Sequence, residues 1–513
     1  MNANPLLRIR NGECFDASGV PLVSIDDLRE TILTQVESGA RIASFFGTDL
    51  GRDGGKTAAT PPERVRLICV LAFDNRSELG VIAADAERAY PSLTPDCPQA
   101  HWFEREIFEQ WGVEPIGHPW LKPIRFSPAR SCSVAESVSV VPAPAPDCFH
   151  MQGEEVHEVA VGPVHAGVIE PGHFRFQCLG ETVYHLEISL GYQHRGIERA
   201  LVARPGPRTR HYIETLAGDT TVGHMLAYCR AMESLTSTHV PPRAQAIRGI
   251  AAELERLANH VGDLGALAGD VGFLPTQNYC GRLRGDLLNL TAAICGNRFG
   301  RGLIRPGGVA WDLDHERADA MLALLEAVEK DVRSAVELMF EAPSVLARFE
   351  GTGAVSAETA EQIGLVGPAA RACGLERDVR FNHAYGIYRF ATLPVATWHS
   401  GDCFARAYVR WQEIQRSFEF VRDQLRALPA GAPANEPGAA ATGKMVVTLV
   451  EGWRGEICHA MATDAQGRIA AYKVVDPSFH NWFGLAMALR DQQISDFPLC
   501  NKSFNLSYCG HDL

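Results

Sequence analysis

One stretch in the first third of the chain cannot belong to a helix or to a central strand. Residues 127–149 are rich in Ser, Ala, Val and Pro, and they end in a proline-alanine run from Pro142 to Pro146. Proline has no backbone N–H and favours extended, unpaired backbone. The sequence therefore predicts two folded parts, residues 1–126 and residues 150–513, joined by a linker over residues 127–149.

Length and charge restrict the classes of protein to which the chain can belong. With 513 residues, of which 46% are hydrophobic and 21% charged, it is long enough for two to four ordinary globular domains at about 150 residues each. The net charge of −13 repels phosphate backbones, and no basic run along the sequence offsets it, so we expect no nucleic-acid partner. No apolar run approaches the roughly 18–20 residues of a membrane-spanning helix, and no charged segment leads into an apolar one at the start. We expect a cytoplasmic chain with no transmembrane segment of its own.

The 14 cysteines are scattered along the sequence rather than grouped. No two of them are three residues apart, whereas structural zinc and iron-sulfur sites usually take ligands from such short pairs. In a large chain without a secretion signal, scattered cysteines are expected to be reduced, buried and small hydrophobic residues. The sequence therefore predicts no metal site and no iron-sulfur cluster within this chain.

Residues 1–126 carry the pattern of a mixed α/β domain. Residues 40–46 and 65–73 are apolar and β-branched, as buried strands are, and residues 51–57 between them fit a hairpin loop better than a phosphate-binding loop. Residues 100–111 alternate charge with rings at steps of four, which predicts a short amphipathic helix that ends at Gly112. Its inward face is predicted to carry Phe103, Ile107 and Trp111.

Residues 150–513 read as strands at first and then as helices. Alternation over residues 156–187 predicts a small β region, and an apolar stripe from Ile247 to Val261 predicts a core helix. Further helices are predicted over residues 316–342 and 404–428. On a neighbouring stripe of the core helix we interpret three polar residues as a surface salt bridge with a solvated histidine: Glu253, Arg256 and His260. The predicted fold class is α+β, with the mixed domain followed by a mainly helical domain.

Ordered sequence blocks over nearly the whole chain resemble a known family. Three blocks resemble the 30 kDa subunit of respiratory complex I: Glu104-Arg105-Glu106, Trp111-Gly112-Val113 and Gly117-His118-Pro119. Five blocks resemble the 49 kDa subunit: Gly162 to Gly167, Gly191 to Glu198, Pro242 to Gln245, Ile304 to Val309 and Gly401 to Phe404. The same blocks occur in the large subunits of membrane-bound, energy-converting (group 4) nickel-iron hydrogenases, and the fused order of the domains resembles that branch.

The resemblance also exposes a departure at the hydrogenase metal site. Members with a nickel-iron centre carry two cysteine pairs. Each pair follows a short sequence that we call its lead, which is Glu-Arg-Ile for one pair and Asp-Pro for the other. The four corresponding positions here are Ala217, Thr220, Ser478 and Asn481. Alanine offers no donor, and neutral hydroxyl and amide oxygens are poor ligands for a metal that prefers thiolates. The chain is therefore predicted to hold no nickel-iron centre and not to act as a hydrogenase by itself.

Complex I also lacks these cysteines, and its vacated cavity takes the head of a quinone beside a histidine and a tyrosine. The corresponding tyrosine position here falls on Gly218, and the histidine candidates are His165 and His173. We expect an acceptor pocket near the four vacated positions, with these candidates for proton transfer: Glu214, His165, Asp219 and His224. Glu214 has an alternative, structural interpretation as the partner of Arg195 or Arg305.

Two functions remain open on the sequence. The first is a redox subunit that passes electrons to a quinone-like or other acceptor, coupled to ion translocation, while the iron-sulfur cluster lies in a partner chain. The second is a non-catalytic scaffold or coupling subunit of such a complex. In both cases the resemblance implies a small iron-sulfur subunit, a ferredoxin-like subunit and antiporter-like membrane subunits as partners. It also implies a peripheral position on the cytoplasmic face of the inner membrane.

Overall fold

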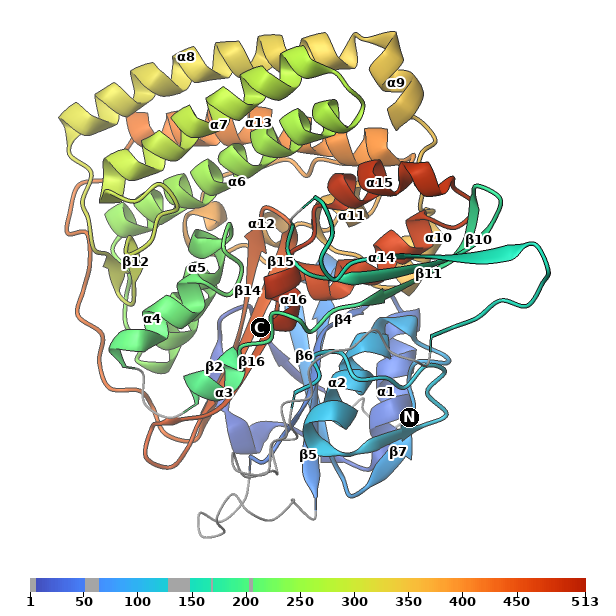
Figure 1. Ribbon diagram of the computed structural model, residues 1–513. Helices are drawn as coiled ribbons and strands as arrows, with labels where there is room; N and C mark the ends of the chain where they lie inside the picture. The colour runs from blue at the N-terminus through green and yellow to red at the C-terminus, as the bar shows by residue number, and fades with distance from the viewer. Residues whose placement is uncertain (1–5, 51–63, 128–147, 168, 203–205) are drawn as a thin grey trace.

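Three layers make up the chain in the computed structural model (Figure 1): an N-terminal mixed sheet with two helices, a central antiparallel sheet, and a bundle of long helices. The predicted α+β fold class is confirmed. Most of the proposed linker, residues 128–147, lies outside the described residues, so the domain boundaries stay a prediction. The structure describes residues 6–50, 64–127, 148–167, 169–202 and 206–513.

The N-terminal sheet has the strand order β1-β6-β5-β4, with β3 parallel to β6. Helix α1 packs on β4 and β6, and α2 packs on β4, so the long strands are covered and almost every residue of β4 and β5 is buried. A strand buried on both faces reads as a continuous apolar run, which is why β4 and β5 were predictable. The bounds are β1 (Leu7–Ile9), β3 (Leu22–Val23), β4 (Arg41–Thr48), β5 (Val65–Phe73), β6 (Glu78–Ala86), α1 (Ile25–Glu37) and α2 (His101–Trp111).

Helix α2 confirms the predicted amphipathic helix, with one correction. Phe103 and Ile107 are each 1% exposed, but Trp111 in the last turn is only half-buried. The Trp111 ring lies against Gly47 of β4, where an added Cβ would come within 2.6 Å of Cδ1. The helix ends at Gly112 in the left-handed conformation, as predicted. Two short parallel strands flank the helix: β7 (Ala89–Pro91) and β8 (Glu114–Ile116).

The central sheet joins the two ends of the sequence. Its order is β16-β15-β14-β2, all antiparallel, and β2 comes from the N-terminal part, with Phe15 opposite Met445. A three-residue strand carries too little periodicity to be predicted, and its partner lies more than 400 residues away. The bounds are β2 (Cys14–Asp16), β14 (Lys444–Gly452), β15 (Gly455–Thr463) and β16 (Ile469–Val475).

Four long helices form the bundle at the top of Figure 1, with α6 in contact with α7 and α13, and α8 across α7 and α13. They confirm the three predicted helices and add α7. The bounds are α6 (Pro242–Asp270), α7 (Leu274–Cys295), α8 (His315–Phe340) and α13 (Cys403–Arg426). No helix within the described ranges combines the length and apolar character needed to cross a membrane.

Shorter elements surround these layers. The predicted small β region is confirmed as a three-stranded antiparallel sheet with order β11-β10-β9, which projects from the molecule (Figure 1). Its bounds are β9 (Val156–Val161), β10 (His173–Leu179) and β11 (Thr182–Ser189). The remaining strands and helices are β12 (Ile304–Arg305), β13 (Gly308–Val309), α3 (Ile197–Leu201), α4 (Pro207–Glu214), α5 (Thr221–Leu235), α9 (Pro343–Phe349), α10 (Ala357–Gln362), α11 (Gly367–Ala372), α12 (Val379–Asn382), α14 (Pro477–Ala488), α15 (Phe497–Phe504) and α16 (Tyr508–Asp512).

The polar stripe on α6 corrects a sequence interpretation. Glu253 and His260 are 0% exposed and Arg256 is 1% exposed, so they form no surface salt bridge. Arg256 and His260 both bond to Glu413 of α13, at 3.3 and 2.8 Å, and Glu413 also accepts two bonds from Arg371. The prediction was wrong because α6 is enclosed on several sides, which its own periodicity cannot reveal.

Buried ion pairs hold the N-terminal part against the rest of the chain. Arg41 of β4 donates to Glu456 of β15 at 2.5 and 2.7 Å. Lys473 of β16 donates to both oxygens of Glu106 of α2, at 2.5 and 2.6 Å. Each of these four side chains is at most 4% exposed, so the pairs stay in place only while the two parts remain together. The described cysteines are free and mostly buried, as predicted.

Candidate functional site

The two segments that correspond to metal-ligand leads lie side by side in the core. The first is the turn from Ala217 to Thr220 before α5, closed by a bond from Thr220 N to Ala217 O at 2.9 Å. The second is the Asp-Pro turn, where Asp476 caps the first turn of α14. His224 of α5 and Asp476 join them, with Nε2 and Oδ2 3.0 Å apart. The two segments therefore meet through a contact between α5 and the start of α14.

The four vacated positions are buried, and each is at most 1% exposed. Ser478 Oγ accepts a bond from Ser507 N at 2.8 Å, and Asn481 exchanges two 3.0 Å bonds with the backbone of Val366. Gly510 of α16 lies so close to the Asp-Pro turn that an added Cβ would be 2.6 Å from Asp476 Cγ. The segment around α16 thus packs directly onto the turn, and the hydroxyl and amide groups already have protein partners.

This donor set does not fit a nickel-iron centre. One position has no donor, the other three carry neutral oxygens or an amide, and no group of three His, Cys, Asp or Glu among the described residues is placed to hold a metal ion. We expect elemental analysis of the purified chain to find no stoichiometric nickel or iron. About one nickel per chain would contradict this expectation.

A row of four buried titratable side chains, linked by hydrogen bonds, runs from β16 to the Asp-Pro turn. Tyr472, His459, His224 and Asp476 are each at most 2% exposed. Tyr472 Oη lies 2.8 Å from His459 Nδ1, and His459 Nε2 lies 3.1 Å from His224 Nδ1. Burial lowers the pKa of His459 well below its usual value, and the charge of a protonated His224 would lower it further, so His459 is neutral.

When both imidazoles are neutral, the hydrogen bonds along this row of four side chains all run in one direction. Burial alone would raise the pKa of Asp476, but the hydrogen bond from His224, the charge of Arg454 and the bond from Ser478 hold it below its usual value. The Asp476 carboxylate therefore accepts a hydrogen bond from His224 Nε2–H. His224 Nδ1 must then accept from His459 Nε2–H, and His459 Nδ1 accepts from the Tyr472 hydroxyl. Such a row of donors and acceptors can pass a proton between its ends.

Two further acidic residues, Asp219 and Glu255, lie next to the row of four side chains. Arg454 donates to both oxygens of Asp219 at 2.6 and 2.8 Å, and this overcomes the effect of burial and lowers the pKa of Asp219. Glu255 accepts from the backbone N–H groups of Val222 and Gly223 at the start of α5. Burial nevertheless raises the pKa of Glu255 to about 8. Glu255 is thus a carboxyl that keeps its proton near neutral pH.

The other two predicted candidates lie apart from these groups. Glu214 is 3% exposed; its Oε1 accepts from Gly302 N at 2.7 Å and lies 3.9 Å from Arg210 Nε. The expected arginine partners, Arg195 and Arg305, are not among its described contacts. His165 sits in the connection between β9 and β10, half-buried, and its Nδ1 accepts from Gly167 N. The described side-chain contacts therefore bring together His224, Asp219 and the leads, but not the carboxyl of Glu214 or the ring of His165.

Sequence reasoning missed four members of the site. Asp476 stood in the Asp-Pro lead, so its position could have suggested a role. His459, Tyr472 and Glu255 lie in strands and a helix with no local signal, and their contacts join residues far apart in the chain. His173, the second histidine candidate, bonds to Gly162 O at 3.2 Å and is 4% exposed.

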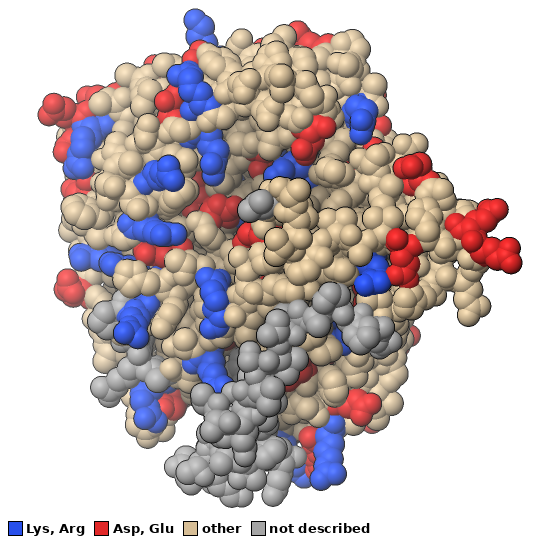
Figure 2. Space-filling view, viewed as in Figure 1, with Lys and Arg blue, Asp and Glu red and all other residues tan. Residues whose placement is uncertain are grey.

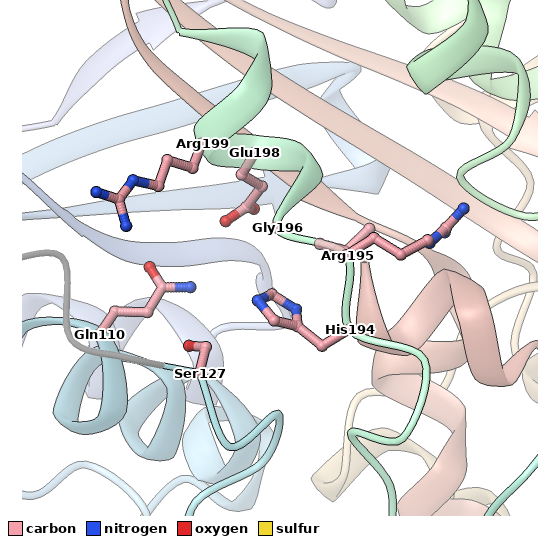
Figure 3. A pocket seen from close by; sticks show the side chains of 8 residues that line it. Gln110, Ser127, His194, Arg195, Gly196, Glu198 and Arg199 are labelled. Carbon is pink, nitrogen blue, oxygen red and sulfur yellow. The ribbon is translucent and has the colours of Figure 1, made fainter. Parts of the chain in front are cut away.

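A hollow of about 250 Å³ lies beside α3, at the shared His-Arg-Gly block. Figure 3 shows the His194 ring facing Gln110 and Ser127 across it, with Glu198 and Arg199 of α3 on another side and Arg195 pointing away. His194 Nδ1 bonds to Asp512 O at 2.7 Å, and burial lowers the pKa of His194. The segment that packs on the Asp-Pro turn thus also forms one wall of this hollow.

Basic side chains gather on one side of the molecule although the chain is acidic overall. Figure 2 shows them along the side where Figure 1 places α4 and β12. The bond from Gly302 to Glu214 holds the segment after α7 against α4. Exposed arginines of these segments include Arg208, Arg210, Arg298, Arg301 and Arg305. The expectation of no basic stripe, made from the linear sequence, misses a patch that only folding assembles.

Comparisons with known proteins agree with the arrangement of two parts. Residues 13–129 match the family described as respiratory-chain NADH dehydrogenase, 30 kDa subunit. Residues 270–444 match the family described as respiratory-chain NADH dehydrogenase, 49 kDa subunit. The two matches follow the same order along this chain as the blocks identified in the sequence.

Individual relatives come from both hydrogenases and NADH dehydrogenases. A carbon monoxide-induced hydrogenase of Rhodospirillum rubrum is 33% identical over 350 residues, 68% of this chain and 97% of its own. Formate hydrogenlyase subunit 5 of Escherichia coli is 28% identical over 493 residues, 92% of this chain and 84% of its own. NADH-quinone oxidoreductase subunit 4 of Thermus thermophilus is 30% identical over 371 residues, 67% of this chain and 90% of its own.

Proposed function

This chain belongs to the family that comprises the complex I 30 kDa and 49 kDa subunits and the related hydrogenase subunits, and we propose that, as a complex I-like subunit, it takes part in electron transfer to a quinone-like acceptor. The acceptor takes two electrons from an iron-sulfur cluster of a small partner subunit and two protons, and becomes the hydroquinone. The role of this chain is to bind the acceptor with that partner and to deliver protons.

The row from Tyr472 to Asp476 is the observation that carries this proposal. Burying several titratable groups is costly unless each has a partner, and such groups are common at functional sites. Here every described link is at most 3.1 Å long and the row ends at the vacated metal position. Glu255 adds a carboxyl that is protonated near neutral pH. These groups can hold and release the protons that reduction of a quinone requires.

The acceptor binds beside this row rather than inside it. Ser478 and Asn481 have internal partners, so a ligand of quinone size would have to displace the segment around α16 to reach them. The hollow at His194 and Glu198 is exposed on this chain and offers a surface that a partner completes. The family membership supports an iron-sulfur subunit, a ferredoxin-like subunit and antiporter-like membrane subunits as partners, with this chain peripheral on the cytoplasmic face of the inner membrane.

A non-catalytic coupling or scaffold subunit is the second candidate. The observation in its favour is the close packing at Ala217 and Ser478, both 0% exposed. In that case the buried row is only structural, and the exposed arginines near α4 serve as a contact surface for partners. The two candidates differ in whether changes that remove a titrating proton affect turnover.

Glu214→Gln and Asp476→Asn, introduced into the assembled complex, separate the two functions. Each change keeps the size of the side chain and removes its titrating carboxyl. We expect electron transfer to a short-chain quinone to fall tenfold or more in Asp476→Asn, equivalent to about 1.4 kcal/mol of barrier. Glu214→Gln tests whether the more distant carboxyl also delivers protons.

Assembly is measured by the subunit content of the purified complex. Asp319→Asn, on the exposed face of α8, is the matched control and is expected to keep the full rate. If both site variants assemble and retain full electron transfer and ion translocation, the proton-transfer role is refuted and the scaffold function gains.

A further inference from the structure

A second, much larger pocket lies between the N-terminal part and the rest of the chain. It has a volume of about 810 Å³, within the range of sites for small organic ligands. Its walls come from α2, the segment that follows β8, strand β11, α10 and α14. The lining residues from Trp482 to Met487 lie on α14, and Arg490 follows the end of that helix. None of the four vacated metal-ligand positions lines this pocket, so it is distinct from them. We call it the α2–α14 pocket.

Aromatic side chains from separate elements line the α2–α14 pocket. Trp102 comes from α2, Trp120 from the segment after β8, and Phe483 from α14. Trp102 is 8% exposed, and its indole Nε1–H is buried without a hydrogen-bond partner in the described part of the chain. Aromatic walls of this kind favour a flat, apolar ligand body.

The same pocket contains a buried cation, Arg105, that has no carboxylate within ion-pair distance in the described part of the chain. Arg105 is 6% exposed, and its described hydrogen bonds go to the backbone oxygens of Lys122 and Pro123, at 2.7 and 3.0 Å. Its guanidinium lies over the Trp102 ring, 4.7 Å from the centroid. Glu187, the acid that lines the pocket, is bonded to Lys122 Nζ at 2.9 Å. Arg256 and Arg371, in contrast, are buried together with carboxylates.

We propose that the α2–α14 pocket binds a planar aromatic anion, with its carboxylate on Arg105 and its rings among Trp102, Trp120 and Phe483. Nε and Nη2 of Arg105 already donate to backbone oxygens, so the carboxylate would accept from the free N–H groups of Nη1 and the second N–H of Nη2. Burial strengthens such a charged bond. Arg490, exposed at the rim and without a described ion pair, adds attraction for an anion. This inference is independent of the proposed acceptor site.

Calorimetric titration of the full chain with 2-naphthoate tests the proposal, with neutral 2-naphthamide as the charge control. We expect 2-naphthoate to bind at a single site, at least tenfold more tightly than the amide. In Arg105→Met, binding of 2-naphthoate should weaken at least tenfold and the preference over the amide should disappear. In Trp120→Ala both compounds should lose affinity by a similar factor, because the change removes part of the apolar wall.

Arg317→Gln is the matched control, because Arg317 is an exposed arginine paired with Asp314 far from the pocket. It should bind both compounds as the parent chain does. Equal affinity for acid and amide, unchanged binding in Arg105→Met, or no binding up to millimolar concentration would overturn the proposal. If Arg105→Met does not fold, unchanged affinity in Trp120→Ala would overturn it instead. Binding to the free chain but not to the assembled complex would show that a partner covers the pocket, which also overturns it.

Discussion

Replacing Glu413 by Gln is expected to lower the free energy of unfolding by about 3–5 kcal/mol, the cost of breaking a buried ion pair. Three groups converge on this one carboxylate, Arg371 at 2.6 and 3.0 Å, His260 at 2.8 Å and Arg256 at 3.3 Å. All four side chains are at most 1% exposed. Glutamine keeps the shape but removes the charge, so two buried guanidinium groups lose a counter-ion that water cannot replace.

The loss of unfolding free energy in Glu413→Gln should also depend on pH. Burial alone would raise the pKa of Glu413, but Arg371 and His260 hold it well below its usual value. A depressed folded-state pKa contributes stability that is fully present above the unfolded value, about 4.5, and is lost as the pH falls below it. The difference between the parent chain and Glu413→Gln should therefore be large at pH 7 and should shrink as the pH falls from about 4.5.

Urea unfolding at several pH values measures both effects. Glu337→Gln is the matched control, because Glu337 forms an exposed pair with Arg333 at 3.6 Å on α8. Such a surface pair contributes at most a few tenths of a kcal/mol, so the control should unfold like the parent chain. A loss below about 1 kcal/mol for Glu413→Gln at pH 7 would show that the network is not cooperative.

The elements that the sequence predicts are those with a long local signal. Residues 65–73 form a strand and residues 404–428 nearly match α13, because apolar runs and helical stripes repeat over many residues. Strand β2 was missed because three residues carry no such repeat. Glu253 was misplaced on the surface because its burial depends on Arg380 and Tyr388, which lie more than 120 residues away and bond to it.

The features of the candidate site were also predictable only where the sequence carries a local signal. The loss of the metal ligands could be recognised from Ala217 alone, because the type of residue at a position is read directly from the sequence. The row through His224 and His459 could not, because it requires α5, β15 and the Asp-Pro turn to meet. The pKa of Glu255 depends on its burial, its backbone donors and the charge of Asp219, none of which appears in the local sequence.

Glu255→Gln should abolish a pH dependence that the parent chain shows near pH 8. Burial raises the pKa of Glu255 to about 8, with a further contribution from Asp219, against the lowering effect of the bonds from Val222 and Gly223. A raised folded-state pKa contributes stability that is fully present below the unfolded value and is lost as the pH rises through about 8. Glutamine stays neutral at every pH and its amide oxygen can keep a backbone bond, so the variant should not lose this stability between pH 6 and pH 9.

Turnover gives the second readout. Within the assembled complex, a Glu255 that donates a proton must be protonated, so the rate of quinone reduction should fall as the pH rises through about 8. Glu255→Gln should reduce the rate at pH 7 tenfold or more and should flatten the profile around pH 8. The matched control, Glu316→Gln in the exposed first turn of α8, should change neither the rate nor the profile.

The two readouts separate a catalytic from a structural Glu255. Asp219 and Asn259 line a cavity of about 10 Å³ with it, room for about one water, through which a proton can leave the carboxyl. If stability at high pH improves in Glu255→Gln while turnover keeps the parent rate and profile, the half-buried carboxyl has only a structural role and protons reach the acceptor by another route. If both change together, the same proton that makes the fold sensitive to pH is the one used in turnover.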